Sequence, residues 1–413
     1  MYADVAVIGG GASGYTSAVE LAEACPDAEI VIVEKLSRTG KKLTATGNGK
    51  CNLSNKSLKA ENYHGSVDAM KIIGMTPDYN DFFVGEMDIM CVSGSEGREG
   101  GIYPHSNSSA TVVNAFRLKL GSLGVKEVCD FEVKSISQKN GKYILRSEED
   151  EIVCRKVIIA CGGYAGTSFG TDGSMLRILK NMGYKTAKIC PAVAPLRVSP
   201  DRLKGLKGVR AKGRISAVSD GKVLRTEYGE IQFNENNISG ICVFNLAYLF
   251  QKYEGKMILR ADLLPETDEK NLIVCLERVR KNRSEYSLEE LLTGIFVKNL
   301  AVYLVKNTLH RPMTDRINSV TGSEIKKLVR AIKCLEFEVT GCSPWQNAQA
   351  TCGGIHADCV TENLESRLHK GIYFCGEILD TVGDCGGYNL QWAWSSGIWA
   401  GRKCAESLKG GKK

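Results

Sequence analysis

The stretch that most limits what this chain can fold into is the glycine-rich segment at residues 9–14. It follows a short apolar run over residues 3–8, which is typical of a buried parallel strand, and it opens a segment with helical spacing of apolar residues. A second apolar run over residues 30–33 ends in Glu34. A strand, a G-x-G-x-x-G turn, a helix, a strand and an acid in this register predict a dinucleotide-binding βαβ unit.

The residues of this unit have separate roles in holding a nucleotide. Gly9 permits the tight turn, Gly11 lets the backbone approach a pyrophosphate, and Gly14 lets the helix pack closely on the strand. The helix N-terminus offers N–H groups and a positive dipole to the phosphates. Glu34 can accept hydrogen bonds from a ribose diol, and its charge disfavours a 2′-phosphate, which points to FAD or NAD rather than NADP. The predicted contacts in this unit are Gly9, Gly11, Ala12, Ser13, Gly14 and Glu34.

A second glycine-rich and basic loop directly follows Glu34, over residues 35–52. An NAD dehydrogenase would normally have another crossover helix at this point. A long polar loop instead suits an extended dinucleotide that runs over the sheet towards a flavin ring, and it therefore favours FAD. The predicted FAD contacts in this loop are Lys35, Lys42, Gly47, Asn48, Gly49, Cys51 and Asn52.

Two further segments are expected to pass close to the nucleotide. An apolar strand over residues 154–159 ends in Ala160, Cys161 and Gly162, whose small size would let the backbone approach the cofactor. Residues 125–136 and 142–147 resemble a strand and its antiparallel partner, joined by a turn at residues 139–141. Val133 lies on this segment and is expected to contact the edge of the adenine.

Near the end of the chain, a glycine turn at residues 385–389 opens a helix. The N-terminus of that helix could bring N–H groups and a positive dipole to the N1–C2=O edge of a reduced flavin. Glu377 ends the preceding short strand and is expected to bond the ribityl chain or the pyrophosphate. Asp380 and Asp384 are looser candidates, with solvated loop acids as the alternative reading. The predicted contacts here are Gly376, Glu377, Gly387, Tyr388, Asn389 and Gln391, while Trp392, Trp394 and Trp399 are expected to pack the helix.

No residue stands out as catalytic from the sequence. Cys51 is a candidate because it lies in the second glycine-rich loop, with a purely structural role as the alternative. Tyr388 is a candidate because its hydroxyl could donate to a substrate carbonyl. No Cys-x-x-Cys pair occurs, so a disulfide-reductase cycle is not expected. No histidine lies in a pattern that marks it as a general acid.

The middle of the chain divides the FAD-binding region. Residues 191–265 contain strands of mixed pattern separated by glycines, which predicts an antiparallel β or barrel-like domain. Residues 266–334 have apolar residues at helical spacing, which predicts a helical domain. The fold class is therefore α/β, with a discontinuous Rossmann-like FAD-binding domain over residues 1–190 and 335–413. The insertion is expected to shape a substrate cavity over the flavin.

Composition restricts the environment and the partners. The 16 cysteines form no Cys-x-x-Cys pair and the five histidines are too few for regular zinc spacings, so no metal site is expected. Cysteines within apolar runs favour a reducing, cytoplasmic location. No apolar window of about 18 residues exists, so no membrane partner is expected. The formal charge of +7 is modest, is spread along the chain and lacks an aromatic-interleaved basic patch, which argues against a nucleic-acid partner.

Four segments carry a resemblance to a known family: residues 7–14, 47–52, 160–163 and 386–397. Together they resemble the BaiN/YhiN-like (aminoacetone-oxidase-type) NAD(P)/FAD-dependent flavoproteins, and the similarity spans nearly the whole chain. The resemblance implies a Rossmann-like FAD-binding domain interrupted by a β-barrel-like domain and a helical domain. Lys50 stands where the family usually has Arg, and Asn48 where it usually has Gly. Lys keeps the charge but loses the planar fork of Arg.

The resemblance implies two activities, which the residues alone do not separate. The leading hypothesis is an NAD(P)H-linked reductase of a hydrophobic unsaturated ketone, of the bile-acid 3-oxo-enone type, working by hydride transfer through flavin N5. The alternative is an FAD-dependent amine oxidase of the aminoacetone type that uses O₂. A third hypothesis is a flavin-dependent tRNA-modifying protein. The leading hypothesis requires FAD, a transient NAD(P)H donor and a small-molecule substrate, and it leaves the oligomeric state open.

Overall fold

The computed structural model describes residues 1–94, 100–253 and 256–410, which form two compact units. Unit 1 runs from Met1 to Pro191 and resumes at Ala348, and unit 2 is Ala192–Asn347. The chain therefore leaves unit 1 once and returns to it once, which is the arrangement expected of an inserted region.

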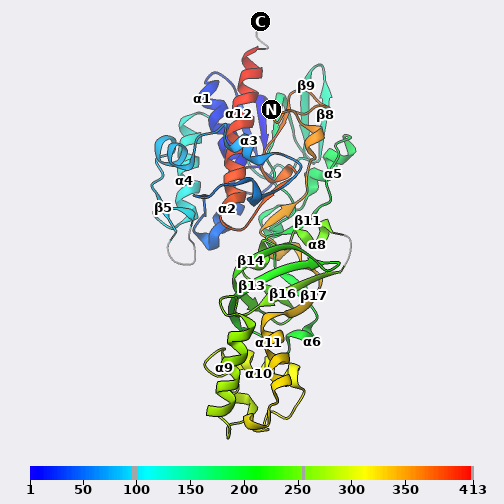
Figure 1. The fold of residues 1–413 in the computed structure, drawn as a ribbon. Helices are drawn as coiled ribbons and strands as arrows, with labels where there is room; N and C mark the ends of the chain where they lie inside the picture. Colours follow the sequence, from blue (N-terminus) through cyan, green and yellow to red (C-terminus); the bar gives the residue numbers. More distant parts are fainter. Residues whose placement is uncertain (95–99, 254–255, 411–413) are drawn as a thin grey trace. The chain divides into compact units, whose positions relative to one another are not determined.

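A sheet of seven strands forms the centre of unit 1 (Figure 1). Its strand order is β7-β2-β1-β10-β9-β8, and β19 also pairs with β10. The pairs of β1 with β2 and β10, of β2 with β7 and of β10 with β19 are parallel, so the carboxyl ends of these strands meet at one edge. The strands are β1 (Tyr2–Ile8), β2 (Ile30–Val33), β7 (Lys126–Val128), β8 (Ser135–Lys139), β9 (Lys142–Arg146), β10 (Glu151–Ile159) and β19 (Ile372–Phe374).

Two helices from opposite parts of the chain, α1 (Ala12–Ala24) and α12 (Tyr388–Gly410), pack against one another in unit 1 (Figure 1). Their backbones approach so closely that a Cβ on Gly397 would lie 2.1 Å from Thr16 Oγ1, and one on Gly401 would lie 2.6 Å from the Ser17 carbonyl oxygen. The Thr16 hydroxyl lies 3.3 Å from the Trp394 carbonyl oxygen and donates to it across the contact. Glycine is required at both positions because no side chain fits there.

The other elements of unit 1 are short segments around this centre. The strand pair β4–β20 and the three-stranded sheet β3-β6-β5 lie outside the main sheet. Their strands are β3 (Ser54–Asn55), β4 (Tyr63–Gly65), β5 (Cys91–Ser93), β6 (Gly101–Pro104) and β20 (Thr381–Gly383), and unit 1 also contains β18 (Ala350–Cys352). Its remaining helices are α2 (Lys41–Ala45), α3 (Ala69–Ile73), α4 (Ser109–Ser122) and α5 (Ser174–Asn181), with a π-helical segment at Asn80–Glu86 and a 3-10 turn at Thr46–Gly49.

Unit 2 contains a closed barrel of six strands in the order β12-β15-β14-β13-β16-β17, and three helices lie between β16 and β17 along the chain (Figure 1). The strand β11 (Cys190–Ala192) spans the boundary between the two units. The barrel strands are β12 (Leu196–Val198), β13 (Arg210–Ser219), β14 (Lys222–Phe233), β15 (Asn237–Ser239), β16 (Met257–Asp262) and β17 (Leu335–Cys342). The helices are α6 (Pro200–Leu203), α7 (Ile241–Phe244), α8 (Leu249–Lys252), α9 (Glu269–Asn282), α10 (Lys298–Leu309) and α11 (Gly322–Lys333).

The strand β17 corrects the expected boundary at residue 335. It pairs with both β16 and β12 and belongs to the barrel, whereas the sequence assigned residues 335–413 to the FAD-binding domain. Its partners lie more than 70 residues earlier in the chain, so no local signal reveals the pairing. The helices also belong to the same unit as the barrel, because Lys333 Nζ lies 2.7 Å from Asp262 Oδ2 and donates to the Leu264 carbonyl oxygen at 2.8 Å.

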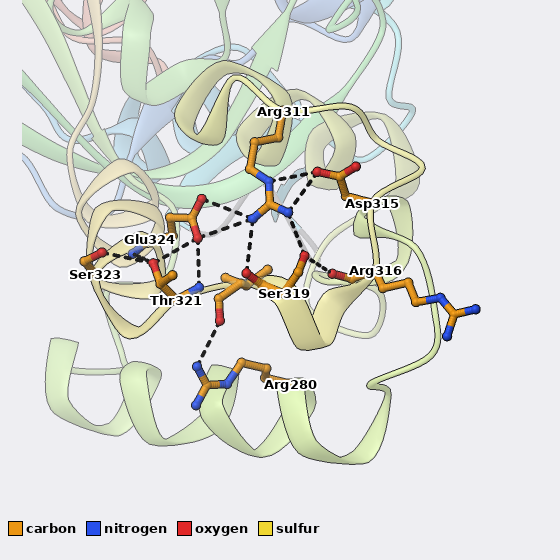
Figure 2. A network of polar contacts seen from close by, with 9 residues as sticks. Arg280, Arg311, Asp315, Arg316, Ser319, Thr321, Ser323 and Glu324 are labelled. Carbon is orange, nitrogen blue, oxygen red and sulfur yellow. Dashed lines mark hydrogen bonds and ion pairs between the residues drawn. The ribbon is translucent and has the colours of Figure 1, made fainter.

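Arg311 holds the segment between α10 and α11 in place (Figure 2). Its Nε donates to Asp315 at 2.9 Å, its Nη1 to Glu324 at 3.3 Å and its Nη2 to the Ser319 hydroxyl at 2.6 Å. Glu324 also completes a capping box with Thr321 at the start of α11. One guanidinium thus joins the loop to the N-terminus of the helix by charge-assisted hydrogen bonds.

We expect Gly397→Ala to destabilise the protein by about 1–3 kcal/mol, because the added methyl group would overlap Thr16 and the backbone of α1. The matched control is Gly121→Ala in α4, where no atom lies within 4 Å of the Cβ position. That change should stabilise by roughly 0.5–1 kcal/mol through helix propensity alone. Urea unfolding followed by circular dichroism measures both. Equal midpoints for the two variants would contradict the close contact of α1 with α12.

Candidate functional site

The glycine turn after β1 has the geometry of a phosphate-binding turn. Gly9 has a φ of +105°, and its N–H donates to the Val33 carbonyl oxygen at 2.8 Å, which ties the turn to the end of β2. A Cβ on Gly14 would lie 1.9 Å from the Gly9 carbonyl oxygen, so the first turn of α1 packs directly on the glycine turn. Only glycine fits at these two positions.

The Glu34 carboxylate contacts this turn from the end of β2. Its Oε2 accepts from the Gly10 N–H and its Oε1 accepts from the Leu36 N–H, each at 3.0 Å. Two backbone donors therefore fix the carboxylate at the carboxyl end of β2, beside the glycine turn. Each oxygen keeps further lone-pair capacity, which a ribose diol could use.

The end of β10 runs against the same turn. A Cβ on Gly9 would lie 2.7 Å from the Ala160 carbonyl oxygen and 2.7 Å from Cys161 Cα, so these backbones are in direct contact. The following Gly162 has a φ of +73°, a conformation that favours glycine. The structure thus brings Ala160, Cys161 and Gly162 to the glycine turn.

The segment after β19 reaches the N-terminus of α1. A Cβ on Gly376 would lie 2.5 Å from Ser13 Oγ, and the Gly376 N–H donates to the Ser396 hydroxyl at 2.8 Å. The next residue, Glu377, forms an ion pair with Lys42 at 2.9 Å and accepts from the Thr351 N–H at 3.1 Å. Lys42 and Glu377, which lie 335 residues apart in the chain, therefore meet beside Gly376.

The loop over residues 35–52 contains an ion pair near its start and exposed residues with positive φ near its end. Lys35 pairs with Asp172 at 3.0 Å. Burial raises the pKa of Asp172, but hydrogen bonds from Ser174 and Lys35 outweigh it and lower that pKa to about 2. Gly47, Asn48 and Gly49 have positive φ values of 57°, 55° and 80° in succession, with Gly47 and Asn48 exposed.

Two features of the structure agree with the binding of a dinucleotide here. No atom lies within 4 Å of the Cβ position of Gly11, at the N-terminus of α1. Asn52 Oδ1 is buried and has no hydrogen-bond partner in the described part of the chain. That oxygen lies 2.9 Å from the Cβ position of Gly387 and faces the turn that opens α12. A buried acceptor without a donor calls for a ligand or water at this place.

The residues of the turn before α12 hold the turn together. The Asn389 amide is fully engaged: its Oδ1 accepts from the Gly383 N–H at 2.8 Å and its Nδ2 donates to the Gly383 carbonyl oxygen at 2.8 Å. Gln391 is buried between Ser54 and Ser395. The Tyr388 hydroxyl donates to the Ser57 carbonyl oxygen at 3.1 Å. These contacts give the three side chains structural roles beside the predicted cofactor segment.

Cys51 lies in the core rather than on the surface of its loop. Its side chain is 0% exposed, and burial raises the pKa of its thiol to about 12. A neutral, enclosed thiol is not a nucleophile at neutral pH. This favours the structural alternative for Cys51.

Val133 is buried on the segment that leads into β8. Two residues earlier, the Phe131 N–H donates to the Glu34 carbonyl oxygen at 3.0 Å, which places this segment beside the end of β2. Contact between Val133 and an adenine stays a prediction. Trp392 and Trp394 are buried, as expected for residues that pack α12, and their indole N–H groups donate to the Gly376 and Leu53 carbonyl oxygens.

The sequence did not draw attention to several residues at this end of the sheet. Thr351 and Asn55 fix Glu377 and Gly386 by hydrogen bonds of 3.1 and 2.9 Å. His64 lies 2.9 Å from Asp384, which is only 3% exposed. Asn55 and His64 lie more than 300 positions from their partners in the chain, and no motif or periodicity connects them. Thr351 lies in a stretch, residues 349–355, that also resembles the family, but the sequence assigns it no role.

Within residues 1–94, 100–253 and 256–410, no three or more His, Cys, Asp or Glu side chains are placed to hold a metal ion. The helices in the same ranges include none with the length and apolar character needed to cross a membrane.

Comparison with known proteins agrees with this geometry. Residues 3–403 match the family model described as HI0933-like protein Rossmann domain. A 3-dehydro-bile acid delta(4,6)-reductase from Clostridium scindens is 33% identical over 411 residues, covering 97% of this chain and 99% of that protein. A ribosomal RNA dihydrouridine synthase from Haemophilus influenzae is 24% identical over 404 residues, covering 96% of each protein.

A solved structure shares the fold over the whole chain. The 3-ketosteroid delta1-dehydrogenase from Sterolibacterium denitrificans superposes with a TM-score of 0.53 at 12% identity, covering 98% of this chain and 100% of that one. The matches together confirm the resemblance drawn from the four sequence segments and the α/β fold class with an inserted barrel and helices.

We expect Gly11→Ala to weaken FAD binding about tenfold or more, because the methyl group would fill the gap at the N-terminus of α1. The φ of −98° at Gly11 is open to alanine, so the unfolding midpoint of the FAD-free protein should not change. Titration with FAD, followed by quenching of flavin fluorescence, gives the dissociation constant. Wild-type affinity in Gly11→Ala would refute this position as the phosphate site, and Gly121→Ala serves as the control.

We expect Cys51 to resist alkylation by iodoacetamide at pH 8 in the folded protein and to react at once in urea. The exposed Cys334 is the internal control and should react in both conditions. Because the pKa of the Cys51 thiol is raised in the folded state, its contribution to stability is complete below the unfolded value near 9 and is lost as the pH rises towards 12. Peptide mapping after alkylation reads out each cysteine. Rapid labelling of Cys51 in the folded protein would contradict its burial.

Proposed function

Because this chain belongs to the HI0933-like family of Rossmann-domain proteins, we propose that it is an FAD-dependent oxidoreductase that reduces a carbon–carbon double bond conjugated to a carbonyl group. The proposed substrate is a hydrophobic unsaturated ketone, and the proposed electron donor is NAD(P)H. The observation that carries the proposal is the 33% identity to a bile-acid delta(4,6)-reductase over 97% of this chain. The arrangement of Gly11, Glu34 and Asn52 supports the cofactor part.

Different residues of the chain would hold different parts of FAD. The open space at Gly11 and the N-terminus of α1 would receive the pyrophosphate, and Glu34 would accept from the ribose hydroxyls. Lys42 and Glu377 offer one cation and one acid beside Gly376, for the phosphates and the ribityl hydroxyls respectively. The turn at Gly386 and Gly387 would meet the pyrimidine end. When bound, FAD supplies hydride transfer at N5.

The distribution of charge favours a second candidate, reduction of a pyrimidine in structured RNA. Unit 2 contains 25 Lys and Arg against 18 Asp and Glu, whereas the rest of the chain contains 29 of each. The whole formal charge of +7 therefore belongs to unit 2 and is not spread along the chain as the sequence analysis assumed. A basic unit suits a polyanionic substrate. The relative from Haemophilus influenzae, a ribosomal RNA dihydrouridine synthase, also supports this candidate.

The two candidates share a chemical requirement. A uracil ring and an unsaturated 3-oxo steroid both present a double bond conjugated to a carbonyl, and a hydride added at the far carbon leaves negative charge on the carbonyl oxygen. A group that donates a proton or a hydrogen bond to that oxygen is then needed. Tyr388 does not fill this role in the described geometry, because its hydroxyl already donates to Ser57.

One anaerobic experiment tests the proposal. We expect NADH or NADPH to bleach the flavin of the purified protein rapidly, and an unsaturated 3-oxo bile acid to restore the yellow colour without oxygen. Bleaching by aminoacetone alone would overturn the reductase and support the amine-oxidase alternative. The Gly11→Ala variant is the control, because it should fold and show little bleaching at the same FAD concentration.

The same reduced protein can be used to distinguish the two candidate substrates. If ribosomal RNA restores the colour and gains two mass units at a uridine while the bile acid does neither, the steroid proposal is wrong and the RNA candidate stands. RNA binding should then fall steeply with salt, because each phosphate contact releases counterions.

A further inference from the structure

A His–Asp pair with a buried carboxylate lies immediately before the glycine turn that opens α12. His64 is on β4 and Asp384 directly follows β20, and the two strands pair antiparallel with Val382 opposite His64. His64 Nε2 lies 2.9 Å from Asp384 Oδ1. The side chains are 15% and 3% exposed, respectively, so solvent hardly reaches the pair.

Further hydrogen bonds fix Asp384 from the same side. Its backbone N–H donates to the Asn62 carbonyl oxygen at 2.9 Å, and the Asn62 amide donates to Asp384 Oδ2 at 3.2 Å. Its carbonyl oxygen accepts from Asn389 Nδ2 at 3.3 Å. The carboxylate, N–H and carbonyl of one residue are therefore all engaged, which leaves the start of the turn with one conformation.

The rest of the turn is held by the two residues of β3, Ser54 and Asn55. The Gly386 carbonyl oxygen accepts from Asn55 Nδ2 at 2.9 Å. A Cβ on Gly387 would lie 2.3 Å from the Ser54 carbonyl oxygen, and the φ values of Gly386 and Gly387 are +133° and +98°. The turn thus contacts two parts of the chain within residues 52–64.

Tyr63 extends the contact to the first residue of α12. Its hydroxyl donates to the Tyr388 carbonyl oxygen at 3.3 Å, and the two rings meet edge to face with centroids 5.9 Å apart. Burial raises the pKa of Tyr63, and nearby Tyr388 and Asp384 add to the rise, so the phenol stays a donor.

We propose that His64 and Asp384 are positioning residues for the proposed flavin chemistry: they fix the 384–387 turn so that its N–H groups and the N-terminus of α12 face the pyrimidine end of FAD. The inference rests on the FAD-binding part of the proposed function. It assigns no proton transfer to substrate, because neither side chain has been placed against one.

Physical chemistry explains why such a pair suits this place. A buried carboxylate is tolerated only where donors satisfy it, and His64 and Asn62 supply two. Without the imidazole, Asp384 would keep one fewer donor in a site that water hardly reaches, and the strand pair would shift to hydrate it. The turn that follows would then lose its single conformation. Backbone N–H groups stabilise the negative charge of a reduced flavin only when they are held in advance.

The midpoint potential of bound FAD tests the inference, because a merely structural role would change stability and leave the potential of the bound flavin unaltered. We expect His64→Phe to shift the potential to a more negative value and to weaken FAD binding about tenfold. His64→Gln keeps an N–H donor for Asp384. We therefore expect its midpoint potential and its affinity for FAD to stay close to those of the wild type. Asp384→Asn provides a second variant should His64→Phe fail to fold, and it should also weaken FAD binding about tenfold.

The matched control is His356→Phe. His356 forms another His–Asp pair in unit 1, with Nδ1 3.1 Å from Asp358, but Asp358 there is exposed. That variant should keep the wild-type potential. A wild-type potential in His64→Phe, or equal impairment of His64→Gln and His64→Phe, would overturn the positioning role. The potential can be measured on any FAD-loaded protein, so a wild type that holds FAD but ignores NADH would overturn the reductase and leave this test intact.

Discussion

The contact of α1 with α12 is the constraint on which unit 1 depends. Gly397 and Gly401 bring the two helix backbones together, and this contact carries Ser13 at the head of α1 to Gly376 at the end of β19. The glycine turn from the start of the chain and the Gly376–Glu377 segment from its last part are consequently brought together at one edge of the sheet. Without the close contact, Gly11, Lys42 and Glu377 would not form one site.

Much of this site could be predicted from sequence because its signals are local. The glycines at residues 9–14, the strands on both sides and Glu34 all lie within one βαβ unit, where spacing determines the fold. The turn of the hairpin at Asn140 and Gly141 was equally readable, since both residues adopt the positive φ that the turn requires. The expected first strand over residues 125–136 was wrong, because β8 (Ser135–Lys139) forms the hairpin and β7 (Lys126–Val128) pairs with β2 instead.

What could not be predicted depends on partners far apart in the chain. The strand β17 reads as a local alternating segment, and only its pairing with β12 and β16 makes it part of the barrel. Asn389 and Gln391 have amides that suit a cofactor, yet packing directs them to Gly383, Ser54 and Ser395. His64 and Asp384 are separated by 320 positions, and a lone histidine in a sequence gives no sign of such a partner.

The two units also differ in the order in which their segments are synthesised. Unit 2 is continuous, from Ala192 to Asn347, so every strand of its barrel has been synthesised before α12 exists. Unit 1 begins first, but its central helix pair needs the last long helix of the fold. During synthesis the inserted unit can therefore complete its core while the older part of the chain still exposes the apolar side of α1. The contact of α1 with α12 therefore forms only after the whole insertion has been synthesised.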